Sequence, residues 1–75
     1  MDVQTIEVPK GSRPNLATER VKRRLSIGQA AELIGVHRNS WSGWELGHYT
    51  PDTMNLLKIC KLFGCDPEYL LERAE

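Results

Sequence analysis

The sequence has little cysteine, no long apolar run and no excess of charge of either sign. Its 75 residues include two cysteines, Cys60 and Cys65, too few for a disulfide framework and without the spacing of a zinc site. No apolar segment approaches the roughly 20 residues that a membrane helix needs. The N-terminus lacks the basic flank and apolar centre of a secretory signal. We therefore expect one small, soluble, cytoplasmic domain with reduced thiols and no metal or cofactor.

Catalytic constellations are also missing. Cys60 and Cys65 are the only nucleophile candidates, and they lie on or beside the apolar side of a predicted helix. Neither has an evident histidine and acid arranged around it, as an activated thiol requires. We therefore expect a protein that is not an enzyme.

The zero net charge argues at first against a nucleic-acid partner, but the charges are unevenly distributed. Residues 10–38 carry seven basic and two acidic side chains, whereas residues 66–75 carry four acidic side chains and one basic. This asymmetry predicts a basic face and an acidic tail, and it is a better guide to partners than the total. If the partner is DNA, the zero total predicts modest affinity that falls strongly with salt.

The N-terminal residues 1–12 differ from the rest of the chain. Alternation over Val3–Val8 is imperfect and ends at Pro9 and Gly11. Two interpretations remain open: a flexible arm, or a short edge strand that pairs with a protein partner. Residues 13–75 are expected to form the folded domain.

Start and stop signals predict five short helices in that domain. Asn15 is a candidate cap for the first, Ser26 and Gln29 form a capping box before the second, and Asp66-Pro67 opens the last. Glycines suited to a left-handed conformation end three of them. The predicted helices cover about 14–24, 27–34, 37–46, 53–63 and 68–73.

The helix predicted over 37–46 has two different sides. Trp41 and Trp44 are three residues apart and share one side, whereas the opposite side is polar or small. That opposite side consists of Arg38, Asn39, Ser42 and Gly43.

Several motifs follow one another along the chain: Ser26, Ala31, Gly35-Val36, Trp44-Glu45-x-Gly47, Pro51, Lys58–Gly64 and Asp66–Leu71. In this order, they resemble the phage-repressor/Cro-like (Xre-type) helix-turn-helix family over about residues 15–72. The resemblance implies an all-α, five-helix repressor-like bundle. It also implies a cytoplasmic, DNA-associated protein encoded by a bacterium or a phage.

The resemblance further implies a sequence-specific transcriptional regulator whose third helix enters the major groove of double-stranded DNA. The positions that would face bases are Arg38, Asn39, Ser42 and Gly43, although glycine offers no side-chain hydrogen bond. Phosphate contacts are expected from the start of the second helix, from the start of the third helix and from the loop after it. These positions are Ile27, Gly28, His37, Ser40, His48, Tyr49 and Thr50.

Other expectations concern the scaffold. The resemblance implies an ion pair between Arg20 and Glu45. Ala30 stands where the family usually has leucine and Trp41 where it usually has a smaller residue, so we expect the Trp41 indole to fill the space beside Ala30. Arg24 replaces a common glycine, His37 replaces a usual Ser or Thr cap, and Ile27 replaces a phosphate-binding glutamine.

One short reading helix contacts too few base pairs for specificity, so a homodimer on a pseudo-palindromic site is expected. The candidate pairing residues are Phe63, Tyr69, Leu70 and Leu71. The alternative function is a protein-interaction module of the same fold, such as an antitoxin or accessory regulator, whose N-terminal segment adds a strand to a partner.

Overall fold

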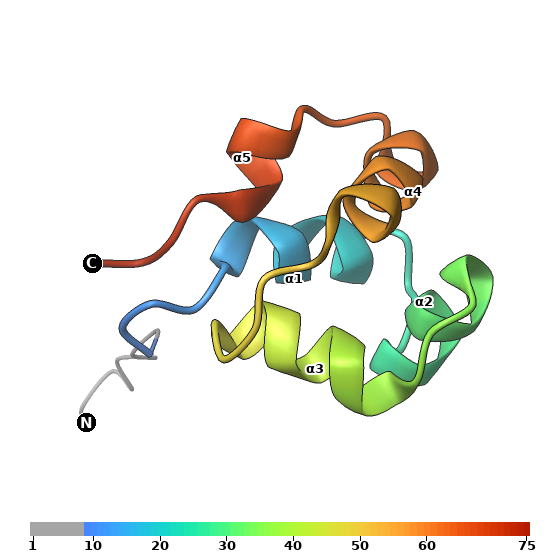
Figure 1. The fold of residues 1–75 in the computed structure, drawn as a ribbon, viewed down its shortest axis with the longest axis horizontal. Helices are drawn as coiled ribbons and strands as arrows, with labels where there is room; N and C mark the ends of the chain where they lie inside the picture. Colours follow the sequence, from blue (N-terminus) through green and yellow to red (C-terminus); the bar gives the residue numbers. More distant parts are fainter. Residues whose placement is uncertain (1–8) are drawn as a thin grey trace, which may run out of the picture.

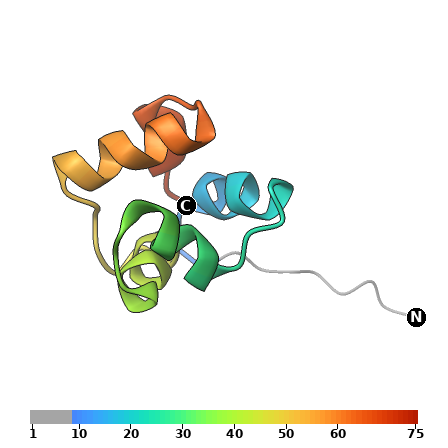
Figure 2. The same cartoon turned by 90° about the vertical axis from the view of Figure 1, so that its right-hand side faces the viewer.

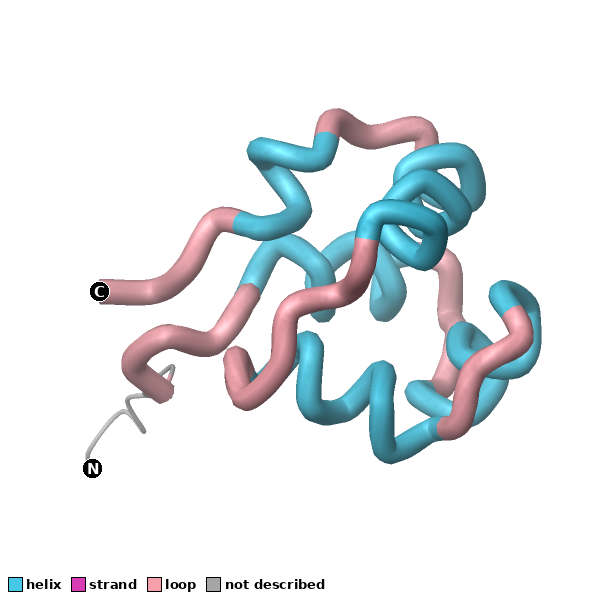
Figure 3. Tube along the Cα trace, in the orientation of Figure 1, coloured by secondary structure: helices cyan, strands magenta, loops and turns pink. Residues whose placement is uncertain are grey.

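The computed structural model describes residues 9–75, and within these residues the chain forms five α-helices and no strand (Figure 1, Figure 3). The all-α fold class expected from the sequence is confirmed. None of these helices is long and apolar enough to cross a membrane. The strand or arm considered for Val3–Val8 lies outside the described residues. The helices are α1 (Pro14–Lys22), α2 (Ile27–Ile34), α3 (Arg38–Leu46), α4 (Thr53–Phe63) and α5 (Pro67–Leu71).

Local signals fix most of the helix boundaries. Ser26 Oγ accepts from the Gln29 amide at 3.0 Å, and Gln29 Oε1 accepts from the Ser26 amide at 2.8 Å, so the capping box is present. Gly35, Gly47 and Gly64 end α2, α3 and α4 with φ values of 78°, 83° and 65°. This left-handed region is costly for side chains beyond glycine.

The predicted start of α1 at residue 14 is confirmed, but its predicted cap and its predicted end were wrong. Asn15 is not the cap: Arg13 occupies that position, and the Asn15 amide donates to the Tyr69 carbonyl oxygen at 2.9 Å. The helix ends at Lys22 rather than Arg24. Arg24 has a φ of 58°, a left-handed conformation that explains why glycine would suit this position.

The five helices pack around one apolar core. In two perpendicular views, α1 lies between the α2–α3 pair and the α4–α5 pair (Figure 1, Figure 2). Trp41 is fully buried in the same core cluster as Ala30, as the volume argument from the sequence requires. The centroid of its ring lies 5.8 Å from that of the Trp44 ring and 6.0 Å from that of the Phe63 ring. The buried apolar residues are Leu16, Ala30, Ala31, Ile34, Trp41, Trp44, Ile59, Phe63 and Leu70.

This core changes the expected pairing surface. Phe63 is 4% exposed and Leu70 is 1% exposed, so neither is available to a second subunit. Leu70 lies on α5, which ends at Leu71 rather than Arg73. Of the four candidate residues, Tyr69 and Leu71 retain solvent contact.

The two ends of the described chain are hydrogen-bonded to each other. The Gly11 amide donates to the Ala74 carbonyl oxygen at 2.9 Å, and the Ala74 amide donates to that of Ser12 at 2.8 Å. Gly11 also approaches the end of α3 so closely that a Cβ at Gly47 would overlap its carbonyl group. Gly47 is therefore required both by its conformation and by this approach.

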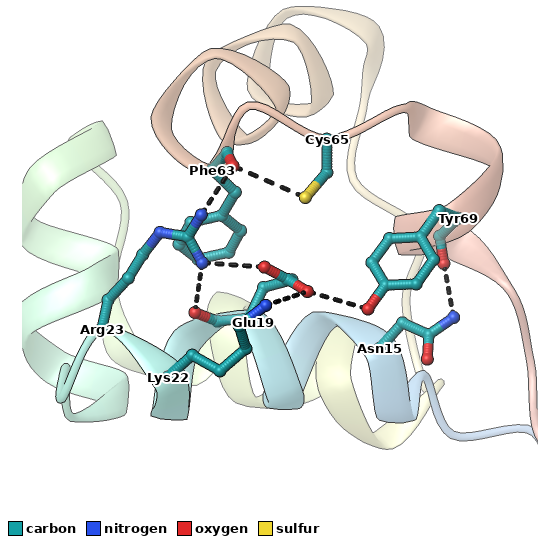
Figure 4. A network of polar contacts seen from close by, with 7 residues as sticks. All are labelled: Asn15, Glu19, Lys22, Arg23, Phe63, Cys65 and Tyr69. Atoms are coloured by element: carbon teal, nitrogen blue, oxygen red, sulfur yellow. Dashed lines mark hydrogen bonds and ion pairs between the residues drawn. The ribbon is translucent and has the colours of Figure 1, made fainter.

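A polar network centred on Glu19 joins α1 to the end of α4 and to α5 (Figure 4). The buried Glu19 carboxylate accepts from Arg23 Nη1 at 2.9 Å and from the Tyr69 hydroxyl at 2.8 Å. Arg23 also donates to the Phe63 carbonyl oxygen at 2.6 Å and lies over the Phe63 ring. These hydrogen bonds lower the pKa of Glu19 from about 4.5 to about 2.

The lowered pKa predicts an acid-dependent loss of stability. Because folding favours ionised Glu19, its contribution is complete above pH 4.5 and is lost as the pH falls through about 2. Glu19→Gln should therefore reduce the free energy of unfolding at pH 7. The difference in unfolding free energy between this variant and wild type should shrink as the pH falls from 4.5 to 2. Urea denaturation across this pH range measures the effect.

Glu32→Gln is the matched control, because Glu32 is an exposed carboxylate on α2. Its unfolding free energy should track that of wild type at every pH. A pH-independent difference between wild type and Glu19→Gln would contradict the assignment of this titration to Glu19.

Candidate nucleic-acid interface

The outer side of α3 presents polar side chains near its N-terminus. Arg38 and Asn39, the first two residues of the helix, are exposed, and Ser42 one turn later is half-buried. The inner side carries the buried Trp41 and Trp44. The structure therefore brings three of the four expected base-facing residues to one accessible side.

Gly43, the fourth of these residues, lies on the same side of α3 but is covered rather than accessible. It is buried, and a Cβ there would overlap the ring of Tyr49, with Cε2 only 2.5 Å away. The Tyr49 ring itself is 61% exposed. Tyr49 thus occupies the surface that a longer side chain at residue 43 would have covered.

His37 caps α3 through its side chain. Its Nδ1 accepts from the Asn39 amide at 3.0 Å. This bond makes His37 a working cap in place of the usual serine or threonine. A neutral ring that accepts at Nδ1 carries its proton on Nε2, which leaves Nε2–H as a donor for an external acceptor.

The start of α2 also offers free donors. The capping box uses the amides of Ser26 and Gln29 and leaves those of Ile27 and Gly28, the first two of the helix. Amides at a helix start have no partner within the helix and attract anions. Both residues are half-buried, so their backbone still borders the surface.

The loop after α3 is fixed by Arg13, one of the basic residues of the segment 10–38. Arg13 is only 2% exposed, and burial, with Arg73 nearby, lowers the pKa of its guanidinium. Its Nη1 donates to the carbonyl oxygens of Trp44 at 2.8 Å and Tyr49 at 2.7 Å, and its Nη2 donates to Thr50 Oγ1 at 3.0 Å. Arg13 therefore holds the exposed segment His48–Thr50 against the end of α3.

The ion pair expected between Arg20 and Glu45 is present. Arg20 Nε and Nη2 donate to the two Glu45 carboxylate oxygens at 2.6 and 3.1 Å. The sequence did not indicate a third donor: Trp41 Nε1 donates to Glu45 Oε2 at 2.6 Å. Glu45 thus joins α1 to the inner side of α3 and satisfies the indole N–H in the core.

Arg13 and Tyr49 are the residues whose roles sequence reasoning missed. Arg13 precedes α1 as one of the seven basic side chains of residues 10–38, and no local pattern separates it from a surface charge. For Tyr49, the absence of a side chain at Gly43 was an available signal, since glycine inside a helix is costly and needs a reason such as close packing.

Comparison with known proteins agrees with this geometry. The family model of the helix-turn-helix domain matches residues 15–75, so the chain belongs to this family and the resemblance drawn from the sequence is confirmed. One relative is repressor protein C2 of Salmonella phage P22, which is 39% identical over 53 residues, or 68% of this chain and 24% of the relative. Another is the HTH-type transcriptional regulator ImmR of Bacillus subtilis (strain 168), which is 33% identical over 60 residues, or 80% of this chain and 47% of the relative. The aligned region thus spans about a quarter of the length of the first relative and about half of the length of the second.

The Glu45 network predicts a large effect on stability. Glu45→Gln removes the buried charge that compensates half-buried Arg20 and should lower the free energy of unfolding by about 3–5 kcal/mol. Urea denaturation followed by tryptophan fluorescence measures this change. Glu68→Gln, on the exposed start of α5, is the control and should change stability by less than about 0.5 kcal/mol. An equally small change for Glu45→Gln would contradict the role assigned to the network.

Proposed function

We propose that the chain is a sequence-specific DNA-binding domain of a transcriptional regulator and that it inserts α3 into the major groove. The observation that carries this proposal is the division of α3 into two sides. One side is locked into the core by Trp41, Trp44 and Glu45, and the other exposes Arg38 and Asn39 at the start of the helix. The names of the two relatives, a repressor and a transcriptional regulator, support the same function.

The exposed side chains have the chemistry that major-groove reading requires. Arginine can donate two hydrogen bonds to guanine O6 and N7, and asparagine can form two with adenine N6 and N7. Each such pair contributes about 1–3 kcal/mol of discrimination against the wrong base. Arg38 would therefore read guanine and Asn39 adenine, with the half-buried Ser42 hydroxyl as a third polar contact.

Phosphate groups on either side of the groove would be held by short-range donors. The free amides of Ile27 and Gly28 would bind one phosphate at the start of α2. Ser40, His37 Nε2 and, after α3, His48 would donate to others. The Thr50 hydroxyl accepts from Arg13 at 3.0 Å, which leaves its proton free for a phosphate oxygen.

Electrostatic attraction would contribute less than the basic residues in the sequence suggest. Arg13, Arg20 and Arg23 all bind acceptors within the domain. The slope of log affinity against log salt counts the phosphates that are neutralised, at about 0.9 per phosphate. The slope should therefore be shallower than the number of arginines suggests, which revises the strong salt dependence expected from the sequence.

A homodimer completes the proposal. The start of one short helix reaches only a few base pairs, so two copies related by two-fold symmetry would read two half-sites about one helical turn apart. Tyr69 and Leu71 are the members of the expected pairing set that remain at the surface.

Selection from random DNA duplexes tests this function. Wild type should enrich a symmetric motif that contains guanine and adenine at adjacent positions in each half-site. Arg38→Ala should relax the guanine preference by about 5- to 150-fold, which corresponds to 1–3 kcal/mol. Lys61→Ala removes an exposed cation from α4 and should leave the motif unchanged.

The selection should be repeated at two salt concentrations to separate base reading from phosphate binding. An enriched motif that keeps its guanine preference in Arg38→Ala would refute the assigned reading side. Absence of any enriched motif with wild type would refute the function itself.

A further inference from the structure

An aromatic ring replaces the missing side chain of Gly43. Gly43 lies four residues after Asn39, so the two positions are neighbours on one side of α3. The Tyr49 ring covers Gly43 closely enough to exclude even a methyl group, yet it remains 61% exposed. The ring therefore extends the accessible side of α3 by about one turn beyond Asn39.

The backbone of Tyr49 is held from two directions. The amides of His48 and Tyr49 donate to the Gly43 carbonyl oxygen at 2.8 and 3.3 Å. The Tyr49 carbonyl oxygen accepts from buried Arg13 Nη1 at 2.7 Å. Arg13 is thus a positioning residue that fixes the backbone of Tyr49, which limits the loop-ordering entropy that ligand binding would cost.

Tyr49 also forms one wall of a shallow hollow of about 420 Å³ on this side of α3. The other lining residues are Asn39, Ser40 and Trp44. The Tyr49 ring supplies exposed apolar surface, whereas Trp44 is only 5% exposed, and Asn39 supplies a polar group. The hollow suits a flat ligand group that combines hydrogen-bonding atoms with an apolar substituent.

We propose that Tyr49 is a specificity-determining residue that contacts the 5-methyl group of a thymine beside the base read by Asn39. This inference rests on the proposed function and deepens it. Thymine is the base that presents a methyl group in the major groove, and apolar side chains recognise it there. The rise of about 6 Å between Asn39 and Gly43, at about 1.5 Å per residue, spans one to two base-pair steps of about 3.4 Å, so the ring faces a neighbouring base.

Replacing thymine by uracil tests the proposal, because it removes only the methyl group. In the duplex enriched by selection with wild type, each thymine is replaced singly and binding is measured by fluorescence anisotropy. Wild type should lose about fourfold in affinity at one thymine of each half-site, the size expected for burial of one methyl group. Tyr49→Ala should bind the thymine and uracil duplexes equally.

Tyr49→Phe separates the ring from the hydroxyl. It should keep the fourfold preference for thymine, since the ring makes the contact. If Tyr49 instead held a phosphate through its hydroxyl, Tyr49→Phe and Tyr49→Ala would weaken binding uniformly across sequences and leave the preference for thymine over uracil unchanged. That outcome would overturn the proposal.

Gly43→Ala provides a second route, because the added methyl group displaces the ring while Tyr49 itself is retained. Gly43→Ala should lose the preference for thymine over uracil, as Tyr49→Ala does. The double variant should lose no more of this preference than either single variant. Circular dichroism melting confirms that each variant is folded. Independent, additive losses would overturn the proposal.

The failure of the proposed function and the failure of this inference give different results. If wild type binds no duplex selectively, the proposed function fails. If wild type binds selectively but keeps the same affinity when uracil replaces any thymine, only the assignment of Tyr49 fails.

Discussion

The Glu45 carboxylate is the interaction on which the orientation of α3 depends. It accepts hydrogen bonds from Arg20 on α1 and from the indole of Trp41 in the core. The backbone carbonyl oxygen of Glu45 also accepts from the Arg13 amide at 2.7 Å. The side chain and the backbone of this one residue therefore bind the two ends of the segment that contains α1. Because a buried charge without its partner is strongly unfavourable, these bonds hold α3 in one rotation about its axis. That rotation decides which side chains face outward.

The same contacts engage three arginines of the basic segment within the domain. Arg13 binds the loop after α3, Arg20 binds Glu45, and Arg23 binds Glu19 and the end of α4. Arginine suits such positions because its planar group donates several hydrogen bonds in fixed directions. The charges of Arg20 and Arg23 are thus paired with carboxylates within the fold, whereas Arg13 donates to uncharged oxygen atoms.

Sequence reasoning succeeded where the determinants are local. The capping box of Ser26 and the left-handed glycines act within a few residues, so their signals are visible in the sequence. The burial of Trp41 followed from the unusual Ala30, since the two changes conserve core volume. The Arg20–Glu45 pair was predicted from the family resemblance.

Arg13, in contrast, bonds to groups 31 to 37 residues away, and the Asn15 amide binds the Tyr69 carbonyl oxygen. Such contacts depend on how the helices meet, and no local pattern distinguishes these side chains from exposed ones.

The central claim, that the outer side of α3 reads the major groove, is tested most directly by methylation interference on the enriched duplex. Methylation of guanine at N7 blocks an acceptor in the major groove, whereas methylation of adenine at N3 blocks one in the minor groove. If Arg38 pairs with guanine, N7 methylation of that guanine should abolish binding in each half-site, and N3 methylation of nearby adenines should leave binding intact. Interference from adenine N3 alone, with N7-methylguanine tolerated throughout the site, would contradict the claim.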